Sequence, residues 1–207
     1  MKYGRPLRYD TLEAAGQTPD FEELASDAYA ALNAEGAKGL GHEEAAIERV
    51  NGMKEEYGTG VSALIMIYNA TGSTLKFDSL ESAHGKIFKY QPDPTIYNGE
   101  WSVFLHVKSS GAARGSGGAV KYWLRGGVPK KAHMLTVNWD IPWSGTNTAG
   151  ATFSHLPPHL DVSQASFMKV MKEIMDAQAN TPFGTRISYS QETSPLIRVM
   201  AARKTVL

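Results

Sequence analysis

The stretch from Gly111 to Gly118, GAARGSGG, is the most glycine-rich part of the 207-residue chain and the first candidate for chemistry. Glycine-rich loops bind phosphate groups when they open a helix, and a P-loop ends in Gly-Lys-Ser or Gly-Lys-Thr. This stretch lacks that ending and leads into AVKYWL, which is typical of a strand. The pattern therefore favours a flexible hairpin loop over a nucleotide site.

Two histidines, His155 and His159, have the four-residue spacing that brings metal ligands to one face of a helix. Pro157 and Pro158 lie between them and are incompatible with a helix interior. No third ligand is near them in the sequence, whereas a zinc site needs at least three protein ligands. We therefore expect no metal.

Nucleophiles are equally poorly supported. No serine stands in a Gly-x-Ser-x-Gly elbow, and Ser116 fails because Arg114 takes the place of the first glycine. The chain has no cysteine, which excludes a thiol nucleophile and a disulfide framework. Asn69-Ala70-Thr71 matches a glycosylation sequon, but without a signal peptide we interpret it as a turn. We predict no catalytic residue and no cofactor, so the protein is not expected to be an enzyme.

Six Tyr and Trp residues between positions 97 and 143 are more informative than these motifs. Trp139 alternates with polar Thr136 and Asn138, which predicts a core position on a strand. Trp143 follows Pro142 in a turn-like stretch and is a candidate for an exposed contact. Trp and Tyr favour membrane interfaces because an apolar ring carries a polar edge. The six residues are Tyr97, Trp101, Tyr122, Trp123, Trp139 and Trp143.

The elements that must position these residues differ between two parts of the chain. Residues 1–60 hold six Lys and Arg against twelve Asp and Glu, a net charge of −6, and predict helices from Thr18 to about Gly36 and over 42–57. Residues 61–207 carry a net charge of +6 and are rich in aromatic and β-branched residues. We predict an N-terminal helical segment, 1–60, that packs on a main domain, 61–207.

Short apolar runs separated by turn residues predict that the main domain is a sandwich or barrel of many strands. One helix, at about 162–179, interrupts the strands. It begins at Asp161 with a capping-box-like Gln164. The fold class is therefore mainly β with flanking helices (α+β). The strands are expected over 61–68, 73–78, 86–90, 101–108, 118–124, 133–139, 151–154, 184–190 and 195–202.

Several motifs occur in a recognisable order between residues 64 and 143. Together they resemble the actinoporin-like fold of sea anemone pore-forming toxins, and are similar to the plant jasmonate-induced proteins and the nakanori-like lipid-binding proteins of mushrooms. The resemblance extends over about residues 57–205. The motifs are Asn69-Ala70-Thr71-Gly72, Pro94-x-Ile96-x-x-Gly99, Gly115-x-x-Gly118-x-Val120-x-Tyr122 and Leu135-x-Val137-x-Trp139-Asp140-Ile141-Pro142-Trp143.

The resemblance implies an actinoporin-like β-sandwich that recognises the phosphocholine headgroup of sphingomyelin. Choline is a quaternary ammonium, which aromatic faces and nearby negative charge can hold. Trp143 can supply the face and Asp140 the charge. By motif, the headgroup-binding residues correspond to Asp140, Pro142, Trp143, Val120 and His84, and the further candidates for membrane contact are Trp101, Tyr97 and Tyr122.

The sequence thus supports the hypothesis of a peripheral lipid-binding protein that recognises sphingomyelin in membranes with cholesterol. The toxins insert an amphipathic N-terminal helix, whereas an acidic segment is poorly suited to a membrane surface. We therefore expect a non-lytic or weakly lytic protein. Two alternatives stay open, which are an actinoporin-type pore-forming cytolysin and a carbohydrate-binding stress or defence module.

The membrane surface is the expected partner. The 21 Lys and Arg balance 21 Asp and Glu, which argues against a nucleic-acid binder, and we expect a monomer without an obligate protein partner. The N-terminal MKYGRPLRYD has no apolar signal region, and no apolar run reaches about 18 residues. We expect a soluble protein, cytoplasmic or released by a non-classical route, that binds the outer leaflet of target membranes.

Overall fold

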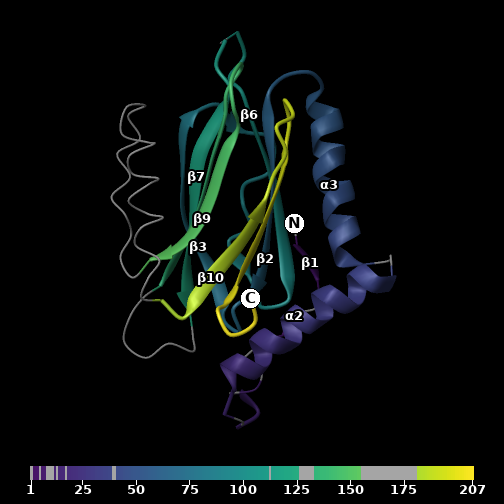
Figure 1. Ribbon diagram of the computed structural model, residues 1–207, viewed down its shortest axis with the longest axis vertical. Coiled ribbons are helices and arrows are strands. Elements are labelled where there is room, and N and C mark those ends of the chain that lie inside the picture. The colour runs from purple at the N-terminus through teal and green to yellow at the C-terminus, as the bar shows by residue number, and fades with distance from the viewer. Residues whose placement is uncertain are drawn as a thin grey trace.

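In its described residues, the computed structural model has two β-sheets packed face to face, with two helices against the outer face of one sheet (Figure 1). The structure describes residues 2–4, 6–7, 12, 14–16, 18–38, 41–111, 113–125, 133–154 and 181–207. The mainly β fold class predicted from the sequence is confirmed. The predicted helix at 162–179 and the pair His155 and His159 lie outside the described residues.

The first sheet, sheet A, has the strand order β1-β6-β2-β11-β10, and β4 pairs with β6. Its β2–β11 pair is parallel and its other pairs are antiparallel. The strands are β1 (Lys2–Gly4), β2 (Ser62–Ala70), β4 (Lys86–Ile87), β6 (Glu100–Val107), β10 (Phe183–Ser188) and β11 (Leu196–Arg203).

The second sheet, sheet B, is antiparallel throughout and has the order β5-β3-β7-β8-β9. β7 and β8 are neighbouring strands in this sheet, and they carry most of the motif residues between positions 115 and 143. The strands are β3 (Thr74–His84), β5 (Thr95–Ile96), β7 (Ser116–Arg125), β8 (Met134–Ile141) and β9 (Thr148–Ser154).

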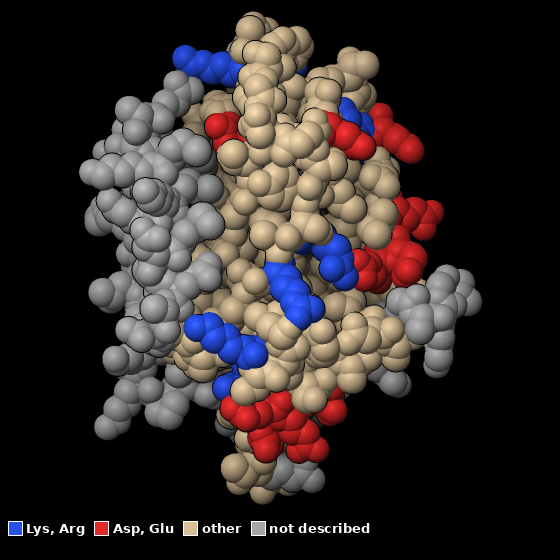
Figure 2. All heavy atoms as spheres, viewed as in Figure 1, with Lys and Arg blue, Asp and Glu red and all other residues tan. Residues whose placement is uncertain are grey.

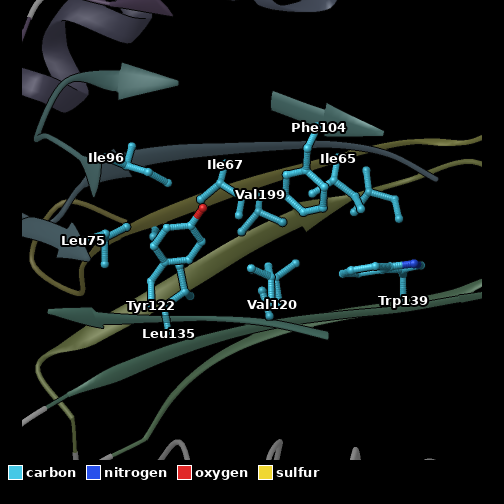
Figure 3. Packing of buried hydrophobic residues seen from close by; sticks show 14 of the residues in the cluster. Ile65, Ile67, Leu75, Ile96, Phe104, Val120, Tyr122, Leu135, Trp139 and Val199 are labelled. Atoms are coloured by element: carbon cyan, nitrogen blue, oxygen red, sulfur yellow. The ribbon is translucent and has the colours of Figure 1, made fainter. Parts of the chain in front are cut away.

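β2 is the central strand of sheet A, and both of its faces are buried. This burial accounts for its long apolar run. Ile65 and Ile67 point into the core between the sheets, where Val120 and Trp139 of sheet B meet them (Figure 3). Met66, from the alternate position, belongs to a second cluster under the helices. One strand therefore contributes to both cores.

The helices α2 (Phe21–Lys38) and α3 (His42–Tyr57) cover the outer face of sheet A. Ala28 of α2 and Val50 of α3 are fully buried in the second cluster. The Tyr68 hydroxyl donates a hydrogen bond of 2.7 Å to the Ala28 carbonyl, and the Arg198 guanidinium donates two hydrogen bonds to Glu43 of α3. The helices are thus held on the sheet by apolar packing and by polar contacts.

Most predicted strands coincide with observed ones, but β3 extends to His84, beyond the predicted end at residue 78. Its second half is half-buried except for the exposed Ser82, and the strand carries two register shifts, between Phe77 and Ser79 and between Ser82 and His84. Such bulges insert an extra residue and break the regular alternation that predicts a strand. The short strands β1 and β5 also escape prediction because two or three residues carry no pattern.

The turn predicted at Asn69-Ala70-Thr71 begins at Thr71, because Asn69 and Ala70 are the last residues of β2, and it is organised by the fully buried Asn69 side chain. The Asn69 amide nitrogen donates hydrogen bonds of 2.8 Å to the carbonyls of Ser73 and Ile96. Its Oδ1 accepts hydrogen bonds from the backbone nitrogen and the hydroxyl of Thr71. The turn thereby joins β2 to β3 and fixes how the two sheets face one another.

Replacing this side chain should destabilise the fold. We expect Asn69→Ala to lower the free energy of unfolding by about 3 kcal/mol, because two carbonyls and one amide lose a buried partner. Chemical denaturation measures this loss. The exposed Asn51 of α3 is a matched control, and Asn51→Ala should change stability by less than about 0.5 kcal/mol. Equal effects of the two substitutions would contradict the role of Asn69.

Candidate functional site

Several of the predicted site residues lie at one end of the sandwich, where β3, β6, β8 and β10 finish and β7, β9 and β11 begin. We call this the upper end, as it is at the top of Figure 1. Its loops follow β3 at His84, β6 at Val107, β8 at Ile141 and β10 at Ser188. Segments from both sheets therefore meet in one small region.

The tightest contact at the upper end involves the start of the glycine-rich motif. Gly115 has no room for a side chain, because the Ile141 carbonyl and Pro142 lie against it. Gly118 is equally restricted by the Glu81 carbonyl and the Trp139 ring. Glycine is needed here for close backbone approach at the start of β7. The stretch leads into a strand as predicted, but the expected hairpin is wrong, because β6 belongs to sheet A and β7 to sheet B and the loop crosses between the sheets.

Trp143 is the most exposed large apolar side chain among the described residues, at 55%. It lies directly after the half-buried Pro142, and the Nζ of Lys108 is 5.2 Å from the centre of its ring. This distance is within the range of a cation–π interaction. The Trp143 ring is thus open to solvent and already in contact with one cation.

His84 and Asp140 lie side by side at the ends of β3 and β8, with His84 Nε2 3.1 Å from Asp140 Oδ1. No hydrogen bond joins these two side chains, and the contact is an ion pair only when the His84 ring is protonated. The His84 ring lies over Gly117, and a side chain at Gly117 would displace it. Asp140 keeps about a third of its side chain exposed, so its carboxylate reaches the surface near Trp143.

Beneath this pair lies the fully buried His106, hydrogen-bonded to two serines. Its Nδ1 is 2.8 Å from Ser116 Oγ, and its Nε2 is 3.0 Å from Ser82 Oγ. Because the Ser116 hydroxyl donates its one proton to the His106 carbonyl, we assign the ring proton to Nδ1. Nε2 then accepts a hydrogen bond from Ser82.

The Ser82–His106 pair has the distance found in serine hydrolases, but its electrostatics are unfavourable for catalysis. Burial, together with the neighbouring His84, lowers the pKa of His106 from 6.5 to about 3. Such a weak base is badly matched to proton abstraction at neutral pH. The third group, Ser116, is a hydroxyl in the position where hydrolases carry a carboxylate. The network therefore supports the loops structurally.

A pocket of about 400 Å³ opens beside His84 at the upper end. The pocket lies between the turn after β3 and the loop after β6, and the latter contributes Ser109 and Arg114. Neither residue stands out in the sequence, because only the fold brings the two loops together. The pocket is lined by Ser82, Ala83, His84, Gly85, Ser109 and Arg114.

Four of the predicted contact residues are not at this surface. Val120 and Tyr122 are fully buried between the sheets, and Trp101 is fully buried under the helices. The expectation that these three residues touch lipid is therefore wrong in this structure. Tyr97 is half-buried after β5, at the opposite end of the sandwich. His84, Asp140, Pro142 and Trp143 are the predicted residues that the fold brings together.

The upper end also contains an exposed aromatic residue that the sequence did not single out. Tyr189 follows the last residue of β10 and is 37% exposed. Its signal is weak, because a lone tyrosine beside a polar turn is common. No helix of the described chain is long and apolar enough to cross a membrane.

The fold and these loops define a two-sheet β-sandwich that carries helices on one face and aromatic loops at one end. Residues 24–200 match the family model of the Nakanori-like proteins, so the chain belongs to that family. It is 35% identical over 150 residues to the 23 kDa jasmonate-induced protein of Hordeum vulgare, covering 70% of this chain and 68% of the relative.

Among solved structures, the chain resembles the crystal structure of the lipid binding protein Nakanori with a TM-score of 0.75. The sequences are 24% identical, and the match covers 98% of this chain and 100% of the other. At this identity the likeness shows a shared fold. The mainly β sandwich expected from the sequence thus agrees with the fold of this solved structure.

Because His106 is buried, we predict that the free energy of unfolding depends on pH. Its pKa is lower in the folded chain, so the unfolded chain binds more protons, and stability falls as the pH drops from about 6.5 towards about 3. We expect His106→Asn to remove up to about 1.4 kcal/mol per pH unit from this slope. Urea denaturation at several pH values measures it. The exposed His42 is the control, and a slope retained in His106→Asn but lost in His42→Asn would contradict the assignment.

Proposed function

We propose that the protein is a peripheral lipid-binding protein that recognises sphingomyelin, in membranes that also contain cholesterol, through the loop Asp140–Trp143. The observation that carries the proposal is the exposure of Trp143 on a short loop beside the Asp140 carboxylate. An exposed tryptophan in a loop is costly in water and typical of a contact with the lipid headgroup region.

The chemistry of this loop fits the choline group. A quaternary ammonium cannot donate a conventional hydrogen bond, so an aromatic face and a nearby carboxylate are its natural partners. Lys108 already lies near the Trp143 ring, which indicates that this ring accepts a cation. Asp140 supplies negative charge from the end of β8, and the His84 ring restrains its carboxylate. The phosphate of the same headgroup can be balanced by Lys108 and Arg114.

Membership of the Nakanori-like family supports the same proposal, because Nakanori itself is described as a lipid binding protein. The distribution of charge also agrees with it. Figure 2 shows acidic groups at the lower end and along the edge where α3 lies, whereas tan atoms predominate at the tip of the upper end, with a basic side chain beside them. α2 thus lies away from the surface that we assign to the membrane, whereas α3 runs towards that end and finishes at Tyr57.

The packing of the helices supports binding without efficient lysis. A pore made from the N-terminal segment requires α2 and α3 to leave sheet A. That release exposes Trp101, Met66 and Val50, which are fully buried. It also breaks the ion pair between Arg198 and Glu43. These costs favour a protein that stays folded on the membrane surface.

Trp143→Ala should weaken binding to sphingomyelin–cholesterol vesicles at least about tenfold, because an interfacial aromatic residue is removed. The melting temperature should change by no more than about 2 °C, since the ring is mostly exposed. Co-sedimentation and thermal unfolding measure the two effects. Tyr90→Ala, which changes an exposed aromatic residue packed near Arg49 of α3, should bind normally. Unchanged binding by Trp143→Ala would contradict the proposal, as would equal binding to vesicles without sphingomyelin.

Calcein-loaded sphingomyelin–cholesterol vesicles test the second part of the proposal. We expect bound protein to release little dye, because α2 and α3 remain docked on sheet A. Detergent gives the value for full release, and the same vesicles without protein give the background. Rapid leakage at low protein concentration would instead identify a pore-forming cytolysin.

A further inference from the structure

The exposed large aromatic side chains of the described chain are few and unevenly placed. They are Tyr90, Trp143 and Tyr189, with exposed fractions of 41%, 55% and 37%. Tyr90 packs near Arg49 on the side of α3. Trp143 and Tyr189 both lie at the upper end, on loops that belong to different sheets. Two of the three exposed rings are therefore at the same end of the sandwich.

A buried asparagine connects these two loops. Asn147, which is 4% exposed, donates hydrogen bonds from its side-chain nitrogen to the carbonyls of Ser190 and Glu192, at 3.1 and 2.7 Å. Its backbone nitrogen donates to Gln191 Oε1 at 2.8 Å, and its carbonyl accepts a hydrogen bond from Gln191 Nε2 at 3.2 Å. The tip of the β10–β11 hairpin is thus bonded to the loop that carries Trp143.

We propose that the β10–β11 hairpin is a second membrane contact, with Tyr189 seated in the lipid–water interface beside Trp143. This inference rests on the proposed function, because it assumes that the upper end faces a bilayer. It adds Tyr189 and the β10–β11 hairpin to the contact surface, although recognition of the headgroup does not require them. It also specifies the orientation of the protein, with the long axis of the sandwich directed towards the membrane.

The chemistry of the hairpin favours a bilayer surface as its occupant. Tyrosine has an apolar ring and a hydroxyl that stays hydrated, which suits the headgroup region. The tip, Ser190 to Ser194, is polar with one carboxylate, so it can lie among headgroups without entering the hydrocarbon. Lys108 and Arg114, in the neighbouring loop, supply cations that match lipid phosphates.

The four hydrogen bonds of Asn147 give this arrangement its energetic advantage. Two contact points held in one rigid unit bind a surface with a smaller loss of conformational freedom than two independent loops. Breaking the connection should therefore weaken binding although Asn147 does not itself touch lipid. Asn147 is a positioning residue in this proposal.

Labelling at single cysteines tests where each ring lies, because the chain has no cysteine of its own. Tyr189→Cys, Trp143→Cys and Tyr90→Cys are each labelled with an environment-sensitive fluorophore and mixed with sphingomyelin–cholesterol vesicles. We expect a blue shift, and quenching by lipids spin-labelled near the headgroup, at positions 189 and 143 but not at 90. A shift at 143 without one at 189 overturns this inference and leaves the proposed function intact. No binding of the unmodified protein to these vesicles overturns both.

Affinity measurements supply a second test that does not depend on a label. Tyr189→Ala should raise the dissociation constant for these vesicles about fivefold. Asn147→Ala removes the two side-chain hydrogen bonds but keeps the two backbone bonds to Gln191, so it should raise the dissociation constant by a smaller factor. Tyr90→Ala should leave it unchanged. Circular dichroism confirms that each variant is folded. Normal binding by folded Tyr189→Ala would show that the hairpin does not touch the membrane.

Discussion

The structure depends on one strand that is buried on both faces. β2 contributes Ile65 and Ile67 to the core between the sheets and Met66 to the cluster under the helices. Neither cluster is complete without it, so sandwich and helices are one cooperative unit through the same nine residues. This dual burial holds the acidic helical segment on sheet A.

The upper end has a different organisation, because it is built from polar contacts on top of an apolar core. His106 is buried and neutral between two serines, Trp139 packs edge-on against its ring, and His84 and Asp140 lie above it. These side chains order the ends of β3, β6, β7 and β8 around the exposed Trp143 loop. An aromatic contact on a short loop gains affinity when the loop is fixed before binding.

Sequence patterns predicted the sandwich and the contrast between Trp139 and Trp143, because strand alternation and a Pro-containing turn are local signals. They failed for Trp101 and Tyr122. The strand that carries Trp101 is covered on both faces, so its pattern cannot distinguish an exposed aromatic residue from a buried one. Tyr122 lies on the same face of β7 as Val120 and Leu124, and its assignment to the membrane surface came from the motif. The sequence also did not predict three residues of the upper end, because only the fold brings their separate loops together. These are Arg114, Ser109 and Tyr189. The bulges that place His84 beside Asp140 break the very pattern on which prediction rests.

The parallel pairing of β2 with β11 has a consequence for biosynthesis. β11, residues 196–203, lies between β2 and β10, so sheet A stays open in its middle until this strand has left the ribosome. The half of the sheet made earlier, β1, β6 and β2, presents the free edge of β2 during translation. Exposed apolar edges of this kind favour association with other chains. Rapid completion of the sheet therefore shortens the time for which this edge is exposed.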